Sequence, residues 1–362
     1  MSEPLEIFLV GTPGLEHVLQ AEAVANGFAD AKATAGGVVL TGGWPDVWRA
    51  NLAMRGATRL LVRIGSFMAF HLAQLDKRAR KFPWHDVLKP DVPVRVEVAT
   101  SRKSKIYHAG AATQRIEGAL RVAGYEVSPD APVTIKARID DNHVTISVDT
   151  SGESLHKRGH KEAVGKAPMR ETLASLFLRE CGYDGREPVL DPMCGSGTFV
   201  IEAAEIATGL HPGRSREFAF MHLATFDATW RRVGETHAPP KHFYGSDRDA
   251  GAVRMATENA ARAGVSDLTT FTNLNAADIQ RPHGPPGLVI CNPPYGGRIG
   301  NQRMLFGVYA GLGEALKARF GGWHVGIITS DAGLAKATGL PLQKGPAVPH
   351  GGLKVWLFQA AL

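Results

Sequence analysis

Short apolar runs alternate with helical segments from residue 188 to the end of the chain. Strands are predicted at 188–191, 242–247, 268–275, 287–292, 324–331 and 353–361, and helices at 198–209, 249–264 and 307–320. Gly209 and Gly264 end the first two helices. This alternation predicts an α/β fold with a doubly wound, mostly parallel sheet, which binds ligands beyond the carboxyl ends of its strands.

The N-terminal half shows a different order of elements. Strands are predicted at 7–11, 37–42, 57–67 and 92–100, and a helix at 108–124. Two further strands flank a hairpin turn at Asp140, Asp141 and Asn142. This order predicts small layers of strands and helices in front of the doubly wound sheet. Residues 151–167 lack helical periodicity and are rich in glycine and basic side chains, so we expect them to link the two halves.

Composition limits the class of protein. Of the 362 residues, 44% are hydrophobic and 21% are charged, as in a globular protein with real cores. The sequence contains no run of 18 apolar residues and begins without a basic leader, so we expect a cytoplasmic protein without a membrane span. Cys181, Cys194 and Cys291 are scattered, which predicts no disulfide framework and no metal site.

Charge favours a polyanionic partner. The net charge is +6, and basic residues gather at 77–81, 101–105 and 156–161. The alternative for any one of these clusters is a solvated surface without a partner.

A glycine turn, DPMCGSGTF (191–199), follows the first strand of the doubly wound sheet and opens its first helix. Such a turn lets a ligand approach the backbone and the positive end of the helix. It matches neither a Walker A loop nor G-x-G-x-x-G, so neither a nucleoside triphosphate nor a dinucleotide is favoured. A tight structural turn is the alternative.

Three acids follow three successive strands. Asp191 could hold an ammonium group, Asp247 is placed to accept from ribose hydroxyls, and Asp278 could accept from an adenine amino group. Each acid alone could be a helix cap or a solvated charge. Together they predict a pocket for a nucleoside that carries an amino-acid tail.

The stretch CNPPYGGRIG (291–300) follows the fourth strand. Asn292 offers an acceptor oxygen, and Pro293 and Pro294 restrict the backbone so that a carbonyl points in one direction. Tyr295 offers a ring face to a planar base. We predict that this loop holds an amino group of an aromatic ring in line with an electrophile. Cys291 is predicted to be a small core residue rather than the nucleophile of a cytosine-C5 methyltransferase.

These motifs resemble those of class I S-adenosylmethionine-dependent amino methyltransferases. SLHKRGHKEAVGKAPMRETLA, DPMCGSGTFVIEAAEIA, GSDRDAGAVRMATENAARAG and CNPPYGGRIG resemble blocks of the THUMP-domain RNA guanine-N2 methyltransferases, both those that act on bacterial 23S rRNA and their tRNA relatives. The resemblance implies a ferredoxin-like domain at 1–90, a THUMP RNA-binding domain at 91–155, a linker at 156–167 and a methyltransferase domain with a seven-stranded, mostly parallel sheet at 168–362.

The resemblance also implies roles for particular residues. S-adenosylmethionine, which is converted to S-adenosylhomocysteine (SAH), would be bound by Asp191, Pro192, Cys194, Gly195, Gly197, Thr198, Asp247, Arg248, Asp278 and Asn292. The target base would be held by Asn292, Pro293, Pro294 and Tyr295. From the basic residues themselves we predict that RNA is contacted by Arg102, Lys103, Lys105, Lys157, Arg158 and Arg298. We expect a monomer that acts on rRNA or tRNA.

Other functions fit the same loop. Methylation of adenine N6 in DNA or of a glutamine amide in protein would use the same acceptor geometry, and a catalytically inactive RNA-binding or assembly protein could keep the fold. The basic N-terminal half favours nucleic acid over a peptide.

Overall fold

The computed structural model describes residues 4–161, 169–232, 234, 236, 238, 242–296 and 302–362. The chain divides into two compact units, and each consists of three segments of the sequence. Unit 1 comprises Met1–Gly11, Glu22–Leu155 and Arg216–Arg232, and unit 2 comprises Thr12–Ala21, His156–Ser215 and Val233–Leu362.

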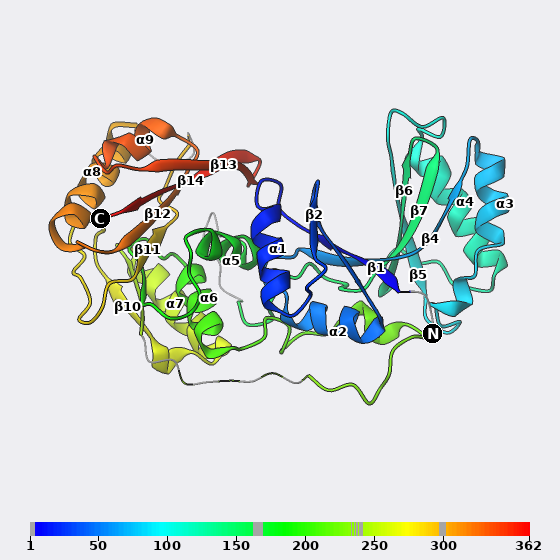
Figure 1. Ribbon diagram of the computed structural model, residues 1–362, viewed down its shortest axis with the longest axis horizontal. Coiled ribbons are helices and arrows are strands. Elements are labelled where there is room, and N and C mark those ends of the chain that lie inside the picture. The colour runs from blue at the N-terminus through cyan, green and yellow to red at the C-terminus, as the bar shows by residue number, and fades with distance from the viewer. Residues whose placement is uncertain are drawn as a thin grey trace. The chain divides into compact units, whose positions relative to one another are not determined.

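Unit 1 contains one seven-stranded sheet with the order β2-β3-β1-β4-β7-β6-β5 (Figure 1). Its strands are β1 (Leu5–Val10), β2 (Lys32–Thr34), β3 (Gly37–Gly42), β4 (Arg59–Met68), β5 (Val94–Thr100), β6 (Val133–Asp140) and β7 (His143–Asp149). Its helices are α2 (Trp44–Ala53), α3 (Leu72–Arg80) and α4 (Ala109–Val122), while α1 (Glu16–Ala25) begins in unit 2 and ends in unit 1. Among the described strands of this sheet, β5 and β6 form the parallel pair, and α4 connects them as a crossover.

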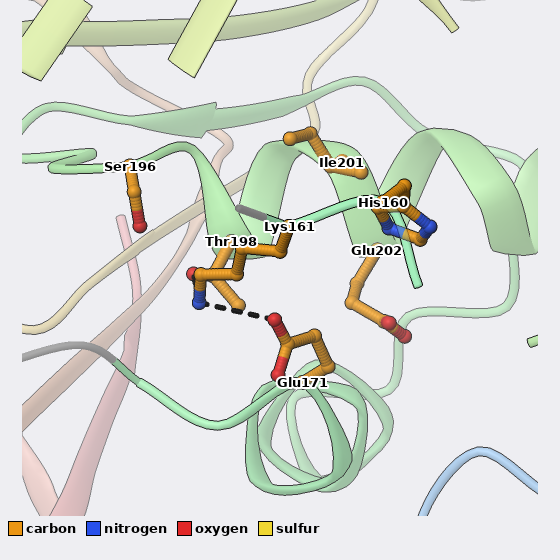
Figure 2. A pocket seen from close by; sticks show the side chains of 7 residues that line it. All are labelled: His160, Lys161, Glu171, Ser196, Thr198, Ile201 and Glu202. Atoms are coloured by element: carbon orange, nitrogen blue, oxygen red, sulfur yellow. Dashed lines mark hydrogen bonds and ion pairs between the residues drawn. The ribbon is translucent and has the colours of Figure 1, made fainter. Parts of the chain in front are cut away.

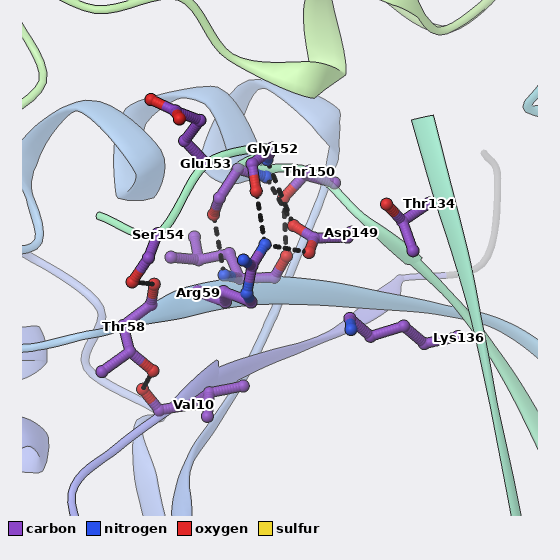
Figure 3. A network of polar contacts seen from close by, with 12 residues as sticks. Val10, Thr58, Arg59, Thr134, Lys136, Asp149, Thr150, Gly152, Glu153 and Ser154 are labelled. Carbon is purple, nitrogen blue, oxygen red and sulfur yellow. Dashed lines mark hydrogen bonds and ion pairs between the residues drawn. The ribbon is translucent and has the colours of Figure 1, made fainter. Parts of the chain in front are cut away.

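β4 pairs with β7, and this pair joins β2, β3, β1 and β4 to β7, β6 and β5 in one sheet. At the end of this pair, the Arg59 guanidinium pairs with the buried Asp149 carboxylate and donates to the Gly152 carbonyl (Figure 3). The Ser151 hydroxyl accepts from the Leu60 N–H at 2.9 Å. These contacts fix the segment after β7, onto which residues 216–232 pack: the Phe220 N–H donates to the Thr150 carbonyl at 3.0 Å.

Unit 2 contains the second seven-stranded sheet, with the order β10-β9-β8-β11-β12-β14-β13. Its strands are β8 (Val189–Asp191), β9 (Phe243–Asp247), β10 (Thr269–Asn273), β11 (Leu288–Cys291), β12 (His324–Thr329), β13 (Gln343–His350) and β14 (Leu353–Ala361). Its helices are α5 (Glu171–Glu180), α6 (Thr198–Thr208), α7 (Ala250–Ala263), α8 (Gln302–Arg319) and α9 (Ala332–Ala337). The first five strands pair in parallel and β14 pairs antiparallel with β12 and β13.

Helices cover both faces of this sheet (Figure 1). On one face, Tyr309 and Leu316 of α8 and Leu334 of α9 belong to the same core cluster as Val289 and Ile327 of the strands. The opposite face meets α5, since a Cβ on Gly326 would lie 2.7 Å from the Cys181 sulfur. Burial on both faces explains why these parallel strands read as short, continuous apolar runs.

The loop before α1 fits closely against β13. Gly14 has φ +93°, and a Cβ there would lie 2.6 Å from the Ala347 carbonyl oxygen. A side chain is therefore excluded by both the backbone conformation and the space.

The predicted α/β fold with a seven-stranded, mostly parallel sheet is confirmed. The sequence reading missed β2, α9 and β13, of which β13 contains prolines and lies at the sheet edge. The sequence also predicts a helix at 168–180, with Pro168 in its first turn; the structure has α5 there, and Pro168 itself lies outside the described residues. The domain boundaries at 90, 155 and 167 remain predictions; β4 and β7, from either side of residue 90, share one sheet.

In the part of the chain that the structure describes, no helix combines the length and the apolar character that a bilayer crossing requires.

Candidate active site

The carboxyl ends of β8, β9, β10 and β11 meet at one edge of the parallel sheet, because all four strands run in the same direction. Asp191 ends β8 and lies opposite Gly245 of β9, and Asp247 ends β9 opposite Asn273 of β10. The structure therefore places the predicted cofactor-binding loops next to one another.

Asp191 is buried at this edge, with 2% of its surface exposed. Its Oδ1 accepts from the Met193 N–H at 3.0 Å. Burial, together with the neighbouring charge of Asp247, raises the pKa of the Asp191 carboxyl to about 8. A cationic group bound here would favour the ionised carboxylate, so this site suits an ammonium-bearing ligand.

The turn of residues 192–197 leaves its backbone open to a ligand. Gly195 has φ +51°, and no heavy atom lies within 4 Å of where its Cβ would be. At Gly197 (φ +83°), by contrast, a Cβ would lie 3.0 Å from the Ala256 side chain, so this glycine allows α6 and α7 to approach each other. The Cys194 N–H donates to the Ser246 carbonyl at 2.9 Å, which holds the turn against β9.

Asp247 joins the ends of three strands. Its Oδ2 accepts from the Gly195 N–H at 3.1 Å, its Oδ1 from the Asp249 N–H at 2.9 Å, and its carbonyl from the Asn273 side chain at 2.8 Å. Arg248 beside it is exposed. Asp278 lies on an exposed turn after β10, where its N–H donates to the Asn275 carbonyl at 3.0 Å. The roles predicted for Arg248 and Asp278 remain predictions.

The loop after β11 carries an acceptor for which the described residues offer no donor. Asn292 Oδ1 is buried and accepts no hydrogen bond from any residue that the structure describes. A buried carbonyl oxygen without a donor is costly, and a bound N–H group would satisfy it. Pro293 is buried beside it, and Arg298, a predicted RNA contact, lies outside the described residues.

Tyr295 packs against the core cluster between the sheet and α8. Burial raises the pKa of the Tyr295 phenol to about 12, so the ring is neutral at physiological pH. Tyr309 of α8, which the sequence reading missed, donates from its hydroxyl to the Pro294 carbonyl at 3.4 Å and helps to fix the loop. Cys291 is fully buried and burial raises the pKa of its thiol, which agrees with a core residue rather than a nucleophile.

A small cavity lies at the start of α6, directly after the glycine turn (Figure 2). It is lined by His160, Lys161, Glu171, Ser196, Thr198, Ile201 and Glu202. The Lys161 ammonium donates to Thr198 Oγ1 at 2.9 Å and to the Met169 carbonyl at 3.0 Å, and pairs with Glu171 at 3.1 Å. Lys161 thus supports the helix end that presents the glycine turn, a role that sequence reasoning missed because Lys161 stands in a basic cluster.

The basic cluster at 156–161 corrects one prediction. Arg158 was predicted to contact RNA, but its guanidinium pairs with Glu202 at 3.0 Å and both side chains are 1% exposed. A buried, paired guanidinium does not reach a phosphate, so Arg158 is excluded from the RNA contacts. The RNA contact predicted for Lys157 remains a prediction.

The basic cluster at 101–105 is exposed in unit 1. Arg102, Lys103 and Lys105 lie at the surface of the loop after β5, and Tyr107 beside them is 76% exposed. The Lys105 N–H donates to Asn142 Oδ1 at 2.8 Å, which ties this loop to the β6–β7 turn. Among the described residues, no group of three or more His, Cys, Asp or Glu side chains could hold a metal ion.

Comparisons with known proteins agree on one family. The RMKL-like methyltransferase domain matches residues 158–344, and the RlmL ferredoxin-like domain matches residues 6–61. A protein of Synechocystis sp. that is provisionally named an RNA methyltransferase is 31% identical over 96% of this chain and 94% of its own length. A Vibrio cholerae relative, named ribosomal RNA large subunit methyltransferase K/L, is 34% identical over 89% of this chain, which spans 48% of that relative.

A solved structure shows the same architecture. It is titled as a provisional methyltransferase complexed with SAH, and it is 25% identical with a TM-score of 0.83 over 100% of this chain and 99% of its own. The strand order, the matched domain and the relatives agree, and the chain belongs to the RMKL-like methyltransferase family.

Proposed function

We propose that this chain transfers a methyl group from S-adenosylmethionine to the exocyclic N2 of a guanosine in structured RNA, with 23S rRNA as the first candidate and tRNA as the second. The observation that carries the proposal is the buried Asn292 oxygen, which lacks a donor in the described part of the chain and lies at the end of β11 near Tyr295. An exocyclic amino group is a donor of the right kind for this position.

The residues at the ends of β8 and β9 fit the cofactor. The open space at Gly195 lets a ligand approach the backbone, and Asp191 suits the ammonium of its amino-acid tail, with Asp247 near the ribose. A family relative was solved with SAH, which supports this choice. When bound, S-adenosylmethionine supplies a methyl carbon attached to a positively charged sulfur.

The loop after β11 would orient the acceptor nitrogen. Asn292 Oδ1 and the Pro293 carbonyl, fixed in direction by Pro294, would accept the two N–H groups of the base. Tyr295 would face the ring plane. Hydrogen bonds to both acceptors would bend the two N–H bonds out of the plane of the ring. The nitrogen lone pair would then be less delocalised into the ring and more available to the methyl carbon. As the nitrogen–carbon bond forms, the methyl–sulfur bond would break with its electron pair going to sulfur. The methylated nitrogen would lose one proton to water, so no strongly basic side chain is needed.

Two observations support RNA as the substrate: the exposed basic residues of unit 1 and the names of the relatives. Arg102, Lys103 and Lys105 provide exposed positive charge on a braced loop. Both curated relatives described above are named for RNA or rRNA methylation. We infer that residues 91–155 form a THUMP domain that grips the folded RNA through phosphates and shape.

Nucleoside mass spectrometry tests the reaction and the substrate class together. RNA from a deletion strain should lack N2-methylguanosine in one RNA class, and the purified protein should restore it. Restoration of N6-methyladenosine in DNA, or of a methylated glutamine in protein, would instead establish one of the alternatives. If calorimetry detected no binding of S-adenosylmethionine, the result would favour an inactive RNA-binding or assembly protein.

Replacement of Asn292 tests the loop. We expect Asn292→Ala to lower turnover by about 10²–10³-fold, as for loss of one positioned hydrogen-bonding group, with cofactor affinity nearly retained. Asn292→Asp keeps an acceptor oxygen and should lose less. Wild-type turnover in the alanine variant would exclude this role.

A further inference from the structure

The β13–β14 hairpin brings an exposed apolar side chain to the candidate active site. Leu353 is 49% exposed, and its Cδ1 lies 3.7 Å from where a Cβ on Gly296 would be. Gly296 directly follows Tyr295. Val355 and Leu357, which share the face of β14 with Leu353, are buried. Leu353 therefore continues the apolar row of the core out to the catalytic loop.

The position of Leu353 is fixed by the sheet. His350 lies opposite Leu353, and the turn between them consists of Gly351 and Gly352, both with positive φ. This two-residue turn matches the twist of the hairpin. β14 also pairs with β12 along His324–Thr329, so the hairpin tip is held by the same parallel sheet that positions the loop after β11.

Two basic residues lie near the hairpin tip, of which Arg170 carries the charge. Opposite residues of an antiparallel pair project to the same face, so His350 stands next to Leu353. Burial lowers the pKa of His350, and the nearby charge of Arg170, an exposed residue at the start of α5, lowers it further. We call Leu353, His350 and Arg170 the hairpin-tip surface.

The chemistry of this surface selects its occupant. One exposed leucine on a protein surface needs no explanation. Leu353, however, adjoins the loop proposed to hold a base, and the histidine opposite it, His350, lies within range of the Arg170 charge. A polyanion with flat apolar groups, an RNA strand, complements both features. A base that leaves its stack also exposes the neighbouring bases, against which apolar side chains pack in other nucleic-acid complexes.

We infer that the hairpin-tip surface holds the RNA strand next to the target nucleotide, with Leu353 packing against the adjacent base and Arg170 contacting a phosphate. This inference rests on the proposed function. It adds a specificity contact within unit 2 that is separate from the basic loop of unit 1.

The test measures the affinity of the full chain, in the presence of SAH, for unmodified transcripts of 23S rRNA and of tRNA. Leu353→Ala should weaken binding of the methylated class about tenfold, the order expected for loss of one apolar contact to a base. Leu353→Met keeps the apolar volume and should bind as the wild type does. Arg170→Ala should lower the slope of log affinity against log salt by about one.

Controls separate this inference from the proposed function. Val24→Ala removes an apolar side chain that is also 49% exposed, on α1 in unit 1, and should change nothing. SAH affinity and thermal unfolding of Leu353→Ala should match the wild type. Wild-type RNA affinity in Leu353→Ala would overturn the inference alone. A wild-type protein that methylates neither transcript would overturn the proposed function, and one that also binds neither would overturn both.

Discussion

Two basic stretches of this chain have similar sequences and opposite surroundings. In 101–105 (SRKSK), the charged side chains are exposed on a loop of unit 1. In 156–161 (HKRGHK), Arg158 and Lys161 turn inward in unit 2 and meet Glu202 and Glu171. The difference lies in the carboxylates, which belong to α5 and α6 and come together with the cluster only in the fold.

The comparison shows that a basic cluster indicates a polyanion only when no buried carboxylate neutralises it. The first cluster keeps its charges in solvent, where the proposed RNA contact would release counterions, whereas the second supports the helix behind the glycine turn. Variants of the two clusters should therefore separate RNA binding from stability.

The largest effect is expected from Arg158→Met. The substitution leaves the Glu202 carboxylate buried without this partner, which should lower the free energy of unfolding by about 3–5 kcal/mol. Urea denaturation measures it. Arg158→Met combined with Glu202→Leu should recover most of the loss, and Arg102→Met, its exposed counterpart, should stay within about 0.5 kcal/mol of the wild type. A stable Arg158→Met protein would break the comparison.

Lys161→Met should cost about 2–3 kcal/mol, since it removes the ion pair with Glu171 and the bond to Thr198. Burial raises the pKa of Glu171, while the charge of Lys161 lowers it, so the variant raises it further. A folded-state pKa above the unfolded value means that stability falls as pH rises. The deficit of the variant, measured by urea denaturation, should therefore be larger at pH 7 than at pH 5. An equal deficit at both values would contradict the role of this pair.

Charge reversal of the exposed cluster should act on binding alone. For Lys103→Glu with Lys105→Glu we expect RNA affinity to fall about tenfold near physiological salt, and the salt slope to fall by about two, one for each phosphate contact. Fluorescence anisotropy over a salt series measures both, with urea denaturation as the control for an unchanged fold. An unchanged slope would remove these lysines from the RNA contacts.

The smallest effect is expected from His156→Gln. Burial, and then the charges of Arg170 and Arg158, lower the pKa of His156 to about 4. The unfolded chain therefore binds an extra proton below pH 6.5, and stability is lost as pH falls from 6.5 towards 4. Because the side chain is partly exposed, we expect the loss between pH 7 and pH 5 to shrink by only about 1 kcal/mol in the variant. A loss equal to that of the wild type would rule out this contribution.

The sequence was most informative where one strand carries its own signal. The short apolar strands β8, β11 and β12 are buried on both faces, so periodicity and glycine stops located them and the parallel sheet. The edge strand β13 contains two prolines and exposed residues, and its pairing depends on β14 rather than on its own pattern. Whether such a segment forms a strand therefore depends on its tertiary pairing and not on its own sequence pattern.

The candidate site was likewise predictable only where local motifs mark its residues. Asp191, Gly195, Asp247 and Asn292 each follow a strand, and the strand ends meet by topology. Lys161 and Tyr309 act through contacts with residues far along the chain, Thr198 and Pro294, which no local motif records. Arg158 was misassigned for the same reason.

The interleaving of the two units along the sequence limits how such a protein can be rearranged. Residues 12–21 complete unit 2 although they lie near the start of the chain, and residues 216–232 complete unit 1 from within the stretch between α6 and β9. A single cut at residue 155 would take Gly14 away from Ala347 and would deprive the β4–β7 end of the segment that covers it. Neither unit can therefore be exchanged as a single cassette by one recombination event.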